Sequence, residues 1–226
     1  QQGSSSEVGL QYADFAARQQ AWLNSTAADV ALSYWEQYLK GAPSCHSLPL
    51  DASRPAASEY QGAHLASTLP VPLALKLKQF ASTQGCTLFN VLKTAFALSL
   101  GRWGEQNDVV LGLPIACRDS EALQSIVGMI MNTQLFRLTI DETQSFAELV
   151  ALAQKESEHA ELFKVYPFES LVERVVTERQ NHINPLYQIV ISMHNCAQAN
   201  IALSGLDVTL LDRQLDAATV DIILNV

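Results

Sequence analysis

The stretch VGMIMNTQLFRLTI, residues 127–140, decides the fold of this chain. Its second part, residues 133–140, alternates strictly between two sets of side chains, namely Phe136, Leu138 and Ile140 against Leu135, Arg137 and Thr139. Alternation with a period of two is typical of a strand that has one face covered. We therefore predict a strand over 133–140, in a sheet that packs against other elements on one face.

The residues before this strand predict a second strand and two helices. The short apolar run 108–113 favours a buried strand. Residues 71–84 carry apolar side chains at helical spacing, and Gly85 favours the end of that helix. Thr87 can cap the next helix, which is predicted over 87–103 and has a broad apolar stripe.

The residues after the strand continue the mixture of helices and strands. The sequence Ser145-Phe-Ala-Glu148 is a capping box and predicts a helix over 145–160, while Pro167 favours the start of another helix. Further strands are predicted over 187–193, 206–211 and 220–225. Strands that alternate irregularly with pairs of helices indicate an α/β fold, a layered sandwich with a mixed sheet flanked by helices.

The chain divides into two parts of different character. Residues 1–42 are interpreted as a flexible polar lead-in, Gln1–Gly9, followed by two connecting helices. Residues 43–226 are interpreted as a subdomain that is entered through an extended connection over 43–62. Because the sequence starts without methionine and stops inside its last predicted strand, we interpret this subdomain as incomplete at both ends.

Composition and charge argue against several classes of partner. Apolar residues make up 48% of the chain, enough to fill an ordered core, and the formal net charge is −9. A nucleic-acid surface needs clustered lysine and arginine, and the sequence has no such cluster. No apolar stretch reaches the roughly 18 residues of a membrane span. We therefore expect no nucleic-acid partner, no membrane partner and a cytoplasmic location.

The four cysteines, at positions 45, 86, 117 and 196, form no close pair. Zinc sites usually contain closely spaced cysteine ligands, and secreted frameworks pack their cysteines more densely. We therefore expect reduced thiols and no metal site.

Four short stretches follow one another along the chain: Tyr12-Ala-Asp14-Phe15-Ala with Trp22, residues 127–137, Tyr166-Pro167-Phe168-Glu169, and Asn184-Pro185-Leu186-Tyr187-Gln188 with Arg179. In this order and approximate spacing they resemble the core motifs of nonribosomal peptide synthetase condensation domains, of the chloramphenicol acetyltransferase-like superfamily. The departures from the family pattern bear on subtype and substrate: Ile130, Gln180, His182 and Ile183.

The resemblance implies a chloramphenicol acetyltransferase-like half-domain, the C-terminal half of a condensation domain. Such a domain forms a peptide bond between an acyl or peptidyl thioester and an aminoacyl amine during secondary metabolite biosynthesis. Both substrates arrive on carrier proteins through phosphopantetheine, so no directly bound cofactor is implied. The implied partners are peptidyl and aminoacyl carrier proteins and the N-terminal half of the domain.

The family's catalytic motif, His-His-x-x-x-Asp-Gly, is missing from this sequence. The histidines stand at positions 46, 64, 159, 182 and 194, and none has aspartate four residues later. His46 comes nearest, with Asp51 at the fifth position and alanine after it. The resemblance therefore implies that this chain contains no catalytic residue, that the motif lies upstream of Gln1, and that the chain alone is inactive.

Four residues are candidates for binding substrate or carrier, and each has a structural alternative. Asn132, next to Thr133, can hydrogen-bond a thioester carbonyl or a pantetheine amide, or can hold its own backbone. Gly128 can permit a close backbone approach or serve a simple turn. Arg118 can bind a phosphopantetheine phosphate or pair with a surface carboxylate, Asp119 or Glu121. The remaining motif residues are predicted to be structural: Tyr12, Asp14, Arg137, Pro167, Phe168, Glu169, Arg179, Asn184 and Pro185.

Two other functions stay open at this point. A non-catalytic scaffold or carrier-docking module could have diverged from the same family. An epimerisation domain shares the fold and the histidine motif, although the Asn-Thr and Pro-Phe-Glu stretches fit condensation better.

Overall fold

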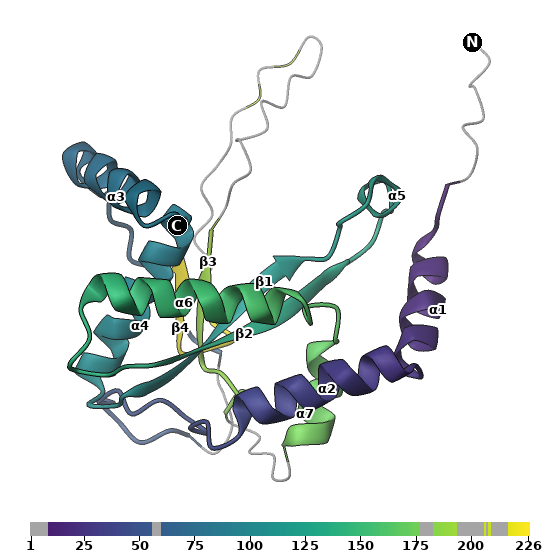
Figure 1. Ribbon diagram of the computed structural model, residues 1–226, viewed down its shortest axis with the longest axis horizontal. Helices are drawn as coiled ribbons and strands as arrows, with labels where there is room; N and C mark the ends of the chain where they lie inside the picture. The colour runs from purple at the N-terminus through teal and green to yellow at the C-terminus, as the bar shows by residue number, and fades with distance from the viewer. Residues whose placement is uncertain (1–8, 56–59, 177–182, 194–205, 207, 209–216) are drawn as a thin grey trace.

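The computed structural model describes residues 9–55, 60–176, 183–193, 206, 208 and 217–226 (Figure 1). Within these residues, helices and strands follow in the order α1 (Tyr12–Leu23), α2 (Thr26–Leu39), α3 (Val71–Thr83), α4 (Leu88–Trp103), β1 (Asp108–Ala116), α5 (Glu121–Gln124), β2 (Met131–Thr139), α6 (Phe146–Glu161), α7 (Phe168–Val175), β3 (Ile189–Ser192) and β4 (Ile222–Asn225). None of the helices in this described part is long and apolar enough to span a membrane.

The four strands form one mixed sheet in the order β2-β1-β3-β4. Strands β1 and β2 are antiparallel, with Leu111 opposite Phe136, whereas β1–β3 and β3–β4 are parallel. The predicted strands at 108–113, 133–140, 187–193 and 220–225 are thereby confirmed. The strand expected over 206–211 lies largely outside the described residues.

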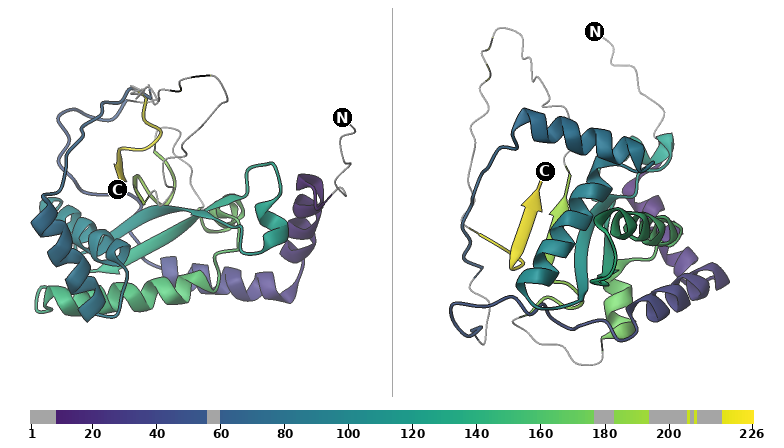
Figure 2. Two further views of the ribbon diagram at one scale, coloured as in Figure 1. Left: turned by 90° about the horizontal axis from the view of Figure 1, so that it is seen from above. Right: turned by 60° about the vertical axis from the view of Figure 1, so that its left-hand side comes forward.

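Strands β1 and β2 are longer than predicted, because they pair along their whole length from Asp108↔Thr139 to Ala116↔Met131. Their far ends carry the short helix α5 away from α3 and α4, as the left view of Figure 2 shows. The apolar run over 108–113 and the alternation over 133–140 cover only the parts of the two strands whose side chains face the core.

Helices α4 and α6 cover one face of the sheet. Their small residues Ala97 and Ala153 pack against the buried side chains of Leu111, Phe136 and Leu138. Both helices begin at the predicted caps, since the Thr87 hydroxyl accepts a hydrogen bond from the Asn90 amide and residues 145–148 form a capping box. The helices predicted over 71–84, 87–103 and 145–160 are confirmed.

The other face of β2 is also covered, so the prediction of one covered face is wrong at Leu135. This side chain is only 1% exposed and belongs to a second cluster that includes Trp35 of α2 and Leu171 of α7. Alternation alone does not reveal such a contact, because α2 lies far earlier in the sequence than β2.

Strand β2 forms one edge of the sheet, and Tyr38 of α2 covers part of that edge. Its hydroxyl accepts a hydrogen bond from the Arg137 amide at 2.7 Å and donates to the Arg137 carbonyl at 3.3 Å. Burial raises the pKa of Tyr38, which keeps the hydroxyl a donor. Pairing the exposed backbone of an edge strand in this way protects it from other strands.

Candidate functional site

The motif stretches of the sequence meet at the end of the sheet where β2 begins. Asn132 is at the centre of this region and is half-buried. Its amide nitrogen donates to the carbonyls of Lys164 (2.8 Å) and Tyr166 (2.7 Å), and its oxygen accepts from the amides of Thr133 and Phe168, both at 2.9 Å. These four bonds use the donors and lone pairs of the carboxamide. The geometry therefore favours the structural alternative for Asn132, in which it fixes β2 to the turn that enters α7.

The Pro-Phe-Glu and Asn-Pro-Leu stretches meet beside β1. Pro167 precedes the first turn of α7, and the Phe168 ring contacts the Tyr187 ring edge-on at 5.3 Å. Tyr187 lies against Gly112 so closely that a Cβ at Gly112 would come within 2.6 Å of the ring. Glu169 is exposed in the first turn of α7, where its negative charge interacts favourably with the helix dipole.

The loop around α5 is held by Arg118. The guanidinium donates to the carbonyls of Leu123 (2.6 Å), Ile126 (2.9 Å) and Gly128 (2.6 Å). Arg118 therefore stabilises its own loop, whereas the neighbouring Asp119 pairs with Lys164. The expected pairing of Arg118 with a nearby carboxylate is replaced by these three backbone contacts.

Gly128 permits a close approach rather than a simple turn. Its φ is +159°, and a Cβ at this position would run into the Tyr12 ring. Helix α1 begins at Tyr12, and Asp14 closes the capping box of this helix by accepting a hydrogen bond from the Gln11 amide at 2.9 Å. Trp22 at the other end of α1 contacts Tyr166 edge-on. The motif stretch over 12–22 therefore contacts both the stretch over 127–137 and the stretch over 166–169.

Arg137 connects three elements at the edge of the sheet. Its guanidinium binds Asp108 through two hydrogen bonds of 2.9 and 2.6 Å and donates to the carbonyls of Tyr38 and Lys40. The hydrogen bonds to Asp108 raise the pKa of Arg137. This geometry agrees with a structural role. Arg179, the remaining motif residue predicted to be structural, lies outside the described residues.

An apolar surface lies next to this region. Val127 and Met129, on the loop that Arg118 fixes, are 95% and 73% exposed, and Met131, the first residue of β2, is 59% exposed. Exposed apolar side chains that form a contiguous patch mark partner or ligand sites, so these three residues are a candidate for such a surface.

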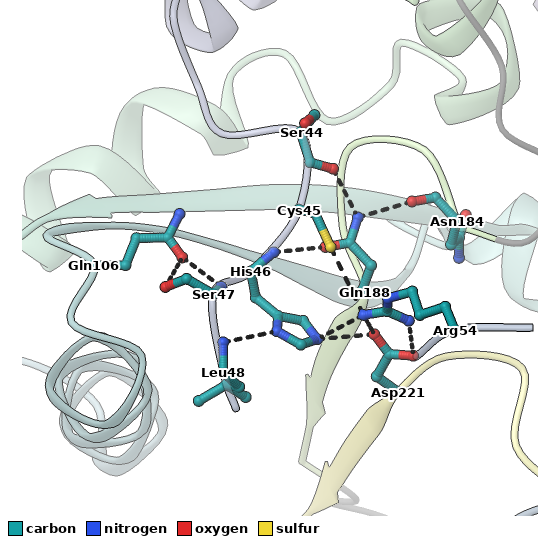
Figure 3. Close-up of polar contacts among 10 residues, drawn as sticks. All are labelled: Ser44, Cys45, His46, Ser47, Leu48, Arg54, Gln106, Asn184, Gln188 and Asp221. Carbon is teal, nitrogen blue, oxygen red and sulfur yellow. Dashed lines mark hydrogen bonds and ion pairs between the residues drawn. The ribbon is translucent and has the colours of Figure 1, made fainter. Parts of the chain in front are cut away.

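A polar cluster that sequence reasoning missed lies at the other end of the Asn-Pro-Leu stretch (Figure 3). Asp221 accepts hydrogen bonds from Arg54 at 2.8 and 2.5 Å and from His46 at 2.8 Å. The Gln188 side chain accepts from the His46 amide and donates to the carbonyls of Ser44 and Asn184. No local signal indicates this cluster, because His46 and Asp221 are 175 residues apart.

Electrostatics in the cluster favour the ionised aspartate. Burial raises the pKa of Asp221, but the hydrogen bonds from Arg54 and His46 outweigh this effect and the pKa lies below its usual value. The side chains of His46, Arg54 and Asp221 are 12%, 19% and 30% exposed, respectively. The described residues contain no group of three or more histidine, cysteine, aspartate or glutamate side chains placed to hold a metal.

The mixed sheet, its helices and the meeting of four motif stretches define a domain of the condensation type. Residues 1–221 match the family described as Condensation domain, and the chain belongs to this family.

Curated relatives include peptide-synthesising enzymes. The chain is 35% identical over 212 residues to phosphinothricin tripeptide synthetase PhsC of Streptomyces viridochromogenes, covering 94% of this chain and 19% of the relative. It is 31% identical over 220 residues to malpinin synthetase of Mortierella alpina, covering 97% of this chain and 3% of that protein. The chain therefore spans only a small part of the relatives that it matches.

Solved structures show the same fold. The X-domain from teicoplanin biosynthesis has a TM-score of 0.88 at 23% identity, over 95% of this chain and 49% of that chain. A four-domain nonribosomal peptide synthetase bound to AMP and glycine has a TM-score of 0.77 at 28% identity, over 81% of this chain and 14% of that chain. A mixed sheet flanked by helices, as expected from the sequence, is confirmed.

Proposed function

We propose that this chain forms the C-terminal half of a condensation domain that makes an amide bond between two carrier-bound substrates. The observation that carries the proposal is the family match over residues 1–221 together with the meeting of all four motif stretches at one end of the sheet. The partners would be peptidyl and aminoacyl carrier proteins, each with phosphopantetheine, and an N-terminal half that contains the histidine motif.

In the proposed reaction, the amine of the downstream substrate attacks the thioester carbonyl of the upstream substrate. The C–N bond forms, the C–S bond breaks, the pantetheine thiolate leaves, and the amine loses one proton to a base. This step needs no nucleophile from the protein, so its main contribution is to hold the two substrates together. The base would be a histidine of the N-terminal half.

The role proposed for this chain is to form one wall of the substrate tunnel and part of the carrier-docking surface. The exposed apolar side chains of Val127, Met129 and Met131 support this role, because they lie on the loop whose position Arg118 and Tyr12 fix and at the start of β2. Asn132 and Thr133 would act by setting where this loop joins β2. An additional phosphate contact of Arg118 remains a prediction.

The test joins this chain to an intact N-terminal half and measures dipeptidyl-carrier formation by mass spectrometry. Met131→Glu should reduce product at least tenfold while leaving the unfolding midpoint of this chain unchanged, because its side chain is 59% exposed. Leu75→Glu on α3, at the opposite end from α5 in Figure 1 and 61% exposed, is the matched control and should leave product formation intact. Equal activity of the two variants would contradict the proposal that this surface forms a wall of the substrate tunnel.

A second candidate is a docking module without catalysis. It is favoured by one observation: the X-domain from teicoplanin biosynthesis in complex with OxyB has the same fold, with a TM-score of 0.86 at 22% identity. The same assay separates the candidates, because a docking module would bind its partner but form no dipeptide with the N-terminal half. An epimerisation domain would invert the carrier-bound residue instead of lengthening the peptide.

A further inference from the structure

A turn in the Asn-Pro-Leu stretch has a backbone conformation that its sequence does not favour. Leu186 has a φ of +69°, in the left-handed region. A proline followed by a residue with positive φ is the order of a type II β-turn, in which glycine or asparagine is the usual second residue. Here leucine follows Pro185, and its Cβ makes this conformation costly. The leucine side chain gains packing against the cluster of Trp35 and Leu135, but the backbone of the turn must be held by other contacts.

The side chain of Gln188 supplies these contacts. Its amide nitrogen donates to the Asn184 carbonyl at 2.9 Å, which closes the turn around Leu186, and to the Ser44 carbonyl at 3.1 Å. Its oxygen accepts from the His46 amide at 3.1 Å. Gln188 is only 5% exposed, so both amide protons and one lone pair are used away from water. The turn is therefore fixed to the connection before α3, as Figure 3 shows.

Tyr187 follows the turn directly, so the turn sets the position of its ring. The ring covers Gly112 in the middle of β1, where a Cβ would come within 2.6 Å of it, and contacts the Phe168 ring edge-on at 5.3 Å. The Phe168 amide donates to the side-chain oxygen of Asn132 at 2.9 Å. Asn132 follows Met131, the first residue of β2. A series of direct contacts therefore leads from the turn to the exposed apolar side chains at the start of β2.

We infer that Gln188 is a positioning residue, which holds the turn in its left-handed conformation and thereby keeps the Tyr187 ring against Gly112. It acts through Tyr187 on α7 and on the start of β2, rather than on a substrate itself. For the reaction, this inference rests on the proposed function. A displaced Tyr187 ring would shift the proposed tunnel wall, and small displacements of positioning groups slow catalysis strongly.

The first test records the ring-current shift of the Gly112 Hα protons by NMR in the 226-residue chain. Gln188→Met has a similar volume but no amide donors, so most of this shift should be lost as the Tyr187 ring moves. Gln134→Met is the matched control, because Gln134 is 7% exposed and its amide nitrogen has no hydrogen-bond partner among the described residues. Gln134 lies opposite Leu113, on the face of the sheet that α4 and α6 cover, so this substitution should leave the shift unchanged. A full Gly112 shift in folded Gln188→Met would overturn the inference.

Leu186→Gly tests the reason for this dependence. Glycine adopts a positive φ without strain, so the turn should depend less on Gln188. The double variant Leu186→Gly, Gln188→Met should therefore keep more of the Gly112 shift than Gln188→Met alone. An equal loss in the two variants would overturn the role given to the left-handed turn.

A further measurement needs no variant and therefore does not depend on whether a variant folds. The side-chain amide protons of Gln188 should exchange with solvent roughly tenfold more slowly than those of the exposed Gln79, as expected for hydrogen bonds formed away from water. Equal exchange of the two side chains would overturn the inference.

The dipeptidyl-carrier assay with the N-terminal half tests the effect on the reaction. Gln188→Met should lower kcat roughly tenfold and change KM by about twofold or less, because the substrates bind but are misplaced. An unchanged kcat in an active pair would overturn the inference. A wild-type pair that forms no dipeptide would contradict the proposed function instead, and the Gly112 shift would then decide whether Gln188 positions the ring.

Discussion

Lys93 provides the sharpest test of the packing described above. This residue of α4 is only 3% exposed, and no carboxylate of the described residues forms an ion pair with it. Its Nζ donates to the Ser157 hydroxyl of α6 at 2.5 Å and lies 4.1 Å from the centre of the Phe136 ring. Burial of the ammonium lowers the pKa of Lys93 from 10.5 to about 8.

The size of the pH effect on stability follows from the difference between the pKa of Lys93 in the unfolded chain and in the folded protein. Between the two pKa values the folded protein has released a proton that the unfolded chain still holds, so stability rises with pH. From pH 7 to pH 9.5 the expected gain in the free energy of unfolding is about 2 kcal/mol. The contact with Phe136 favours the charged form and can reduce the gain to about 1 kcal/mol.

The perturbation is Lys93→Met, which fills a similar volume without a charge. The variant should lose the rise with pH and should be at least as stable as the wild type at pH 7, because the cost of burying the charge disappears. The assay is urea unfolding at several pH values between 7 and 9.5. Lys155→Met, at an exposed lysine of α6, is the control and should keep the wild-type slope. An unchanged slope in Lys93→Met would refute the reasoning.

Three further substitutions test the contacts between motifs, each by its unfolding midpoint in urea. Gly128→Ala should lose about 1–3 kcal/mol, because a φ of +159° strains any residue with a side chain and the new methyl group also meets the Tyr12 ring, and Tyr12→Ala should relieve only the steric part of that loss in the double variant. Arg137→Lys should lose about 2 kcal/mol, since an ammonium cannot make both bonds to Asp108. Asn132→Ala should lose about 3 kcal/mol through its four backbone contacts, and a loss below about 1 kcal/mol would contradict the structural role.

The elements that could be predicted from the sequence are those with local signals. The helix that starts at Thr87 and the capping box at Ser145 need only the adjacent residues, and both form as expected. The strand over 133–140 is visible because its alternation matches the buried side chains of Phe136 and Leu138. The family could also be predicted, because four motif stretches in the family's order are far more specific than any one of them alone.

The contacts between distant residues could not be predicted. Tyr38 of α2 contacts the edge strand β2 at Arg137, 99 residues later in the chain. The alternation of side chains in β2 does not indicate that α2 packs there. For Arg118 the sequence indicates a charged loop residue but does not indicate that three carbonyls of the same loop will face it. Long-range packing decides these contacts, and a single sequence contains little information about it.

The measurement that tests the central claim most directly is dipeptidyl-carrier formation from two loaded carriers. The assay compares this chain alone, this chain with an N-terminal half that contains His-His-x-x-x-Asp-Gly, and this chain with the same half after its second motif histidine is changed to alanine. We expect product only with the intact half, and at least about 100-fold less with the altered half, in line with general acid–base catalysis. Product from the chain alone, or equal product from the two N-terminal halves, would contradict the account.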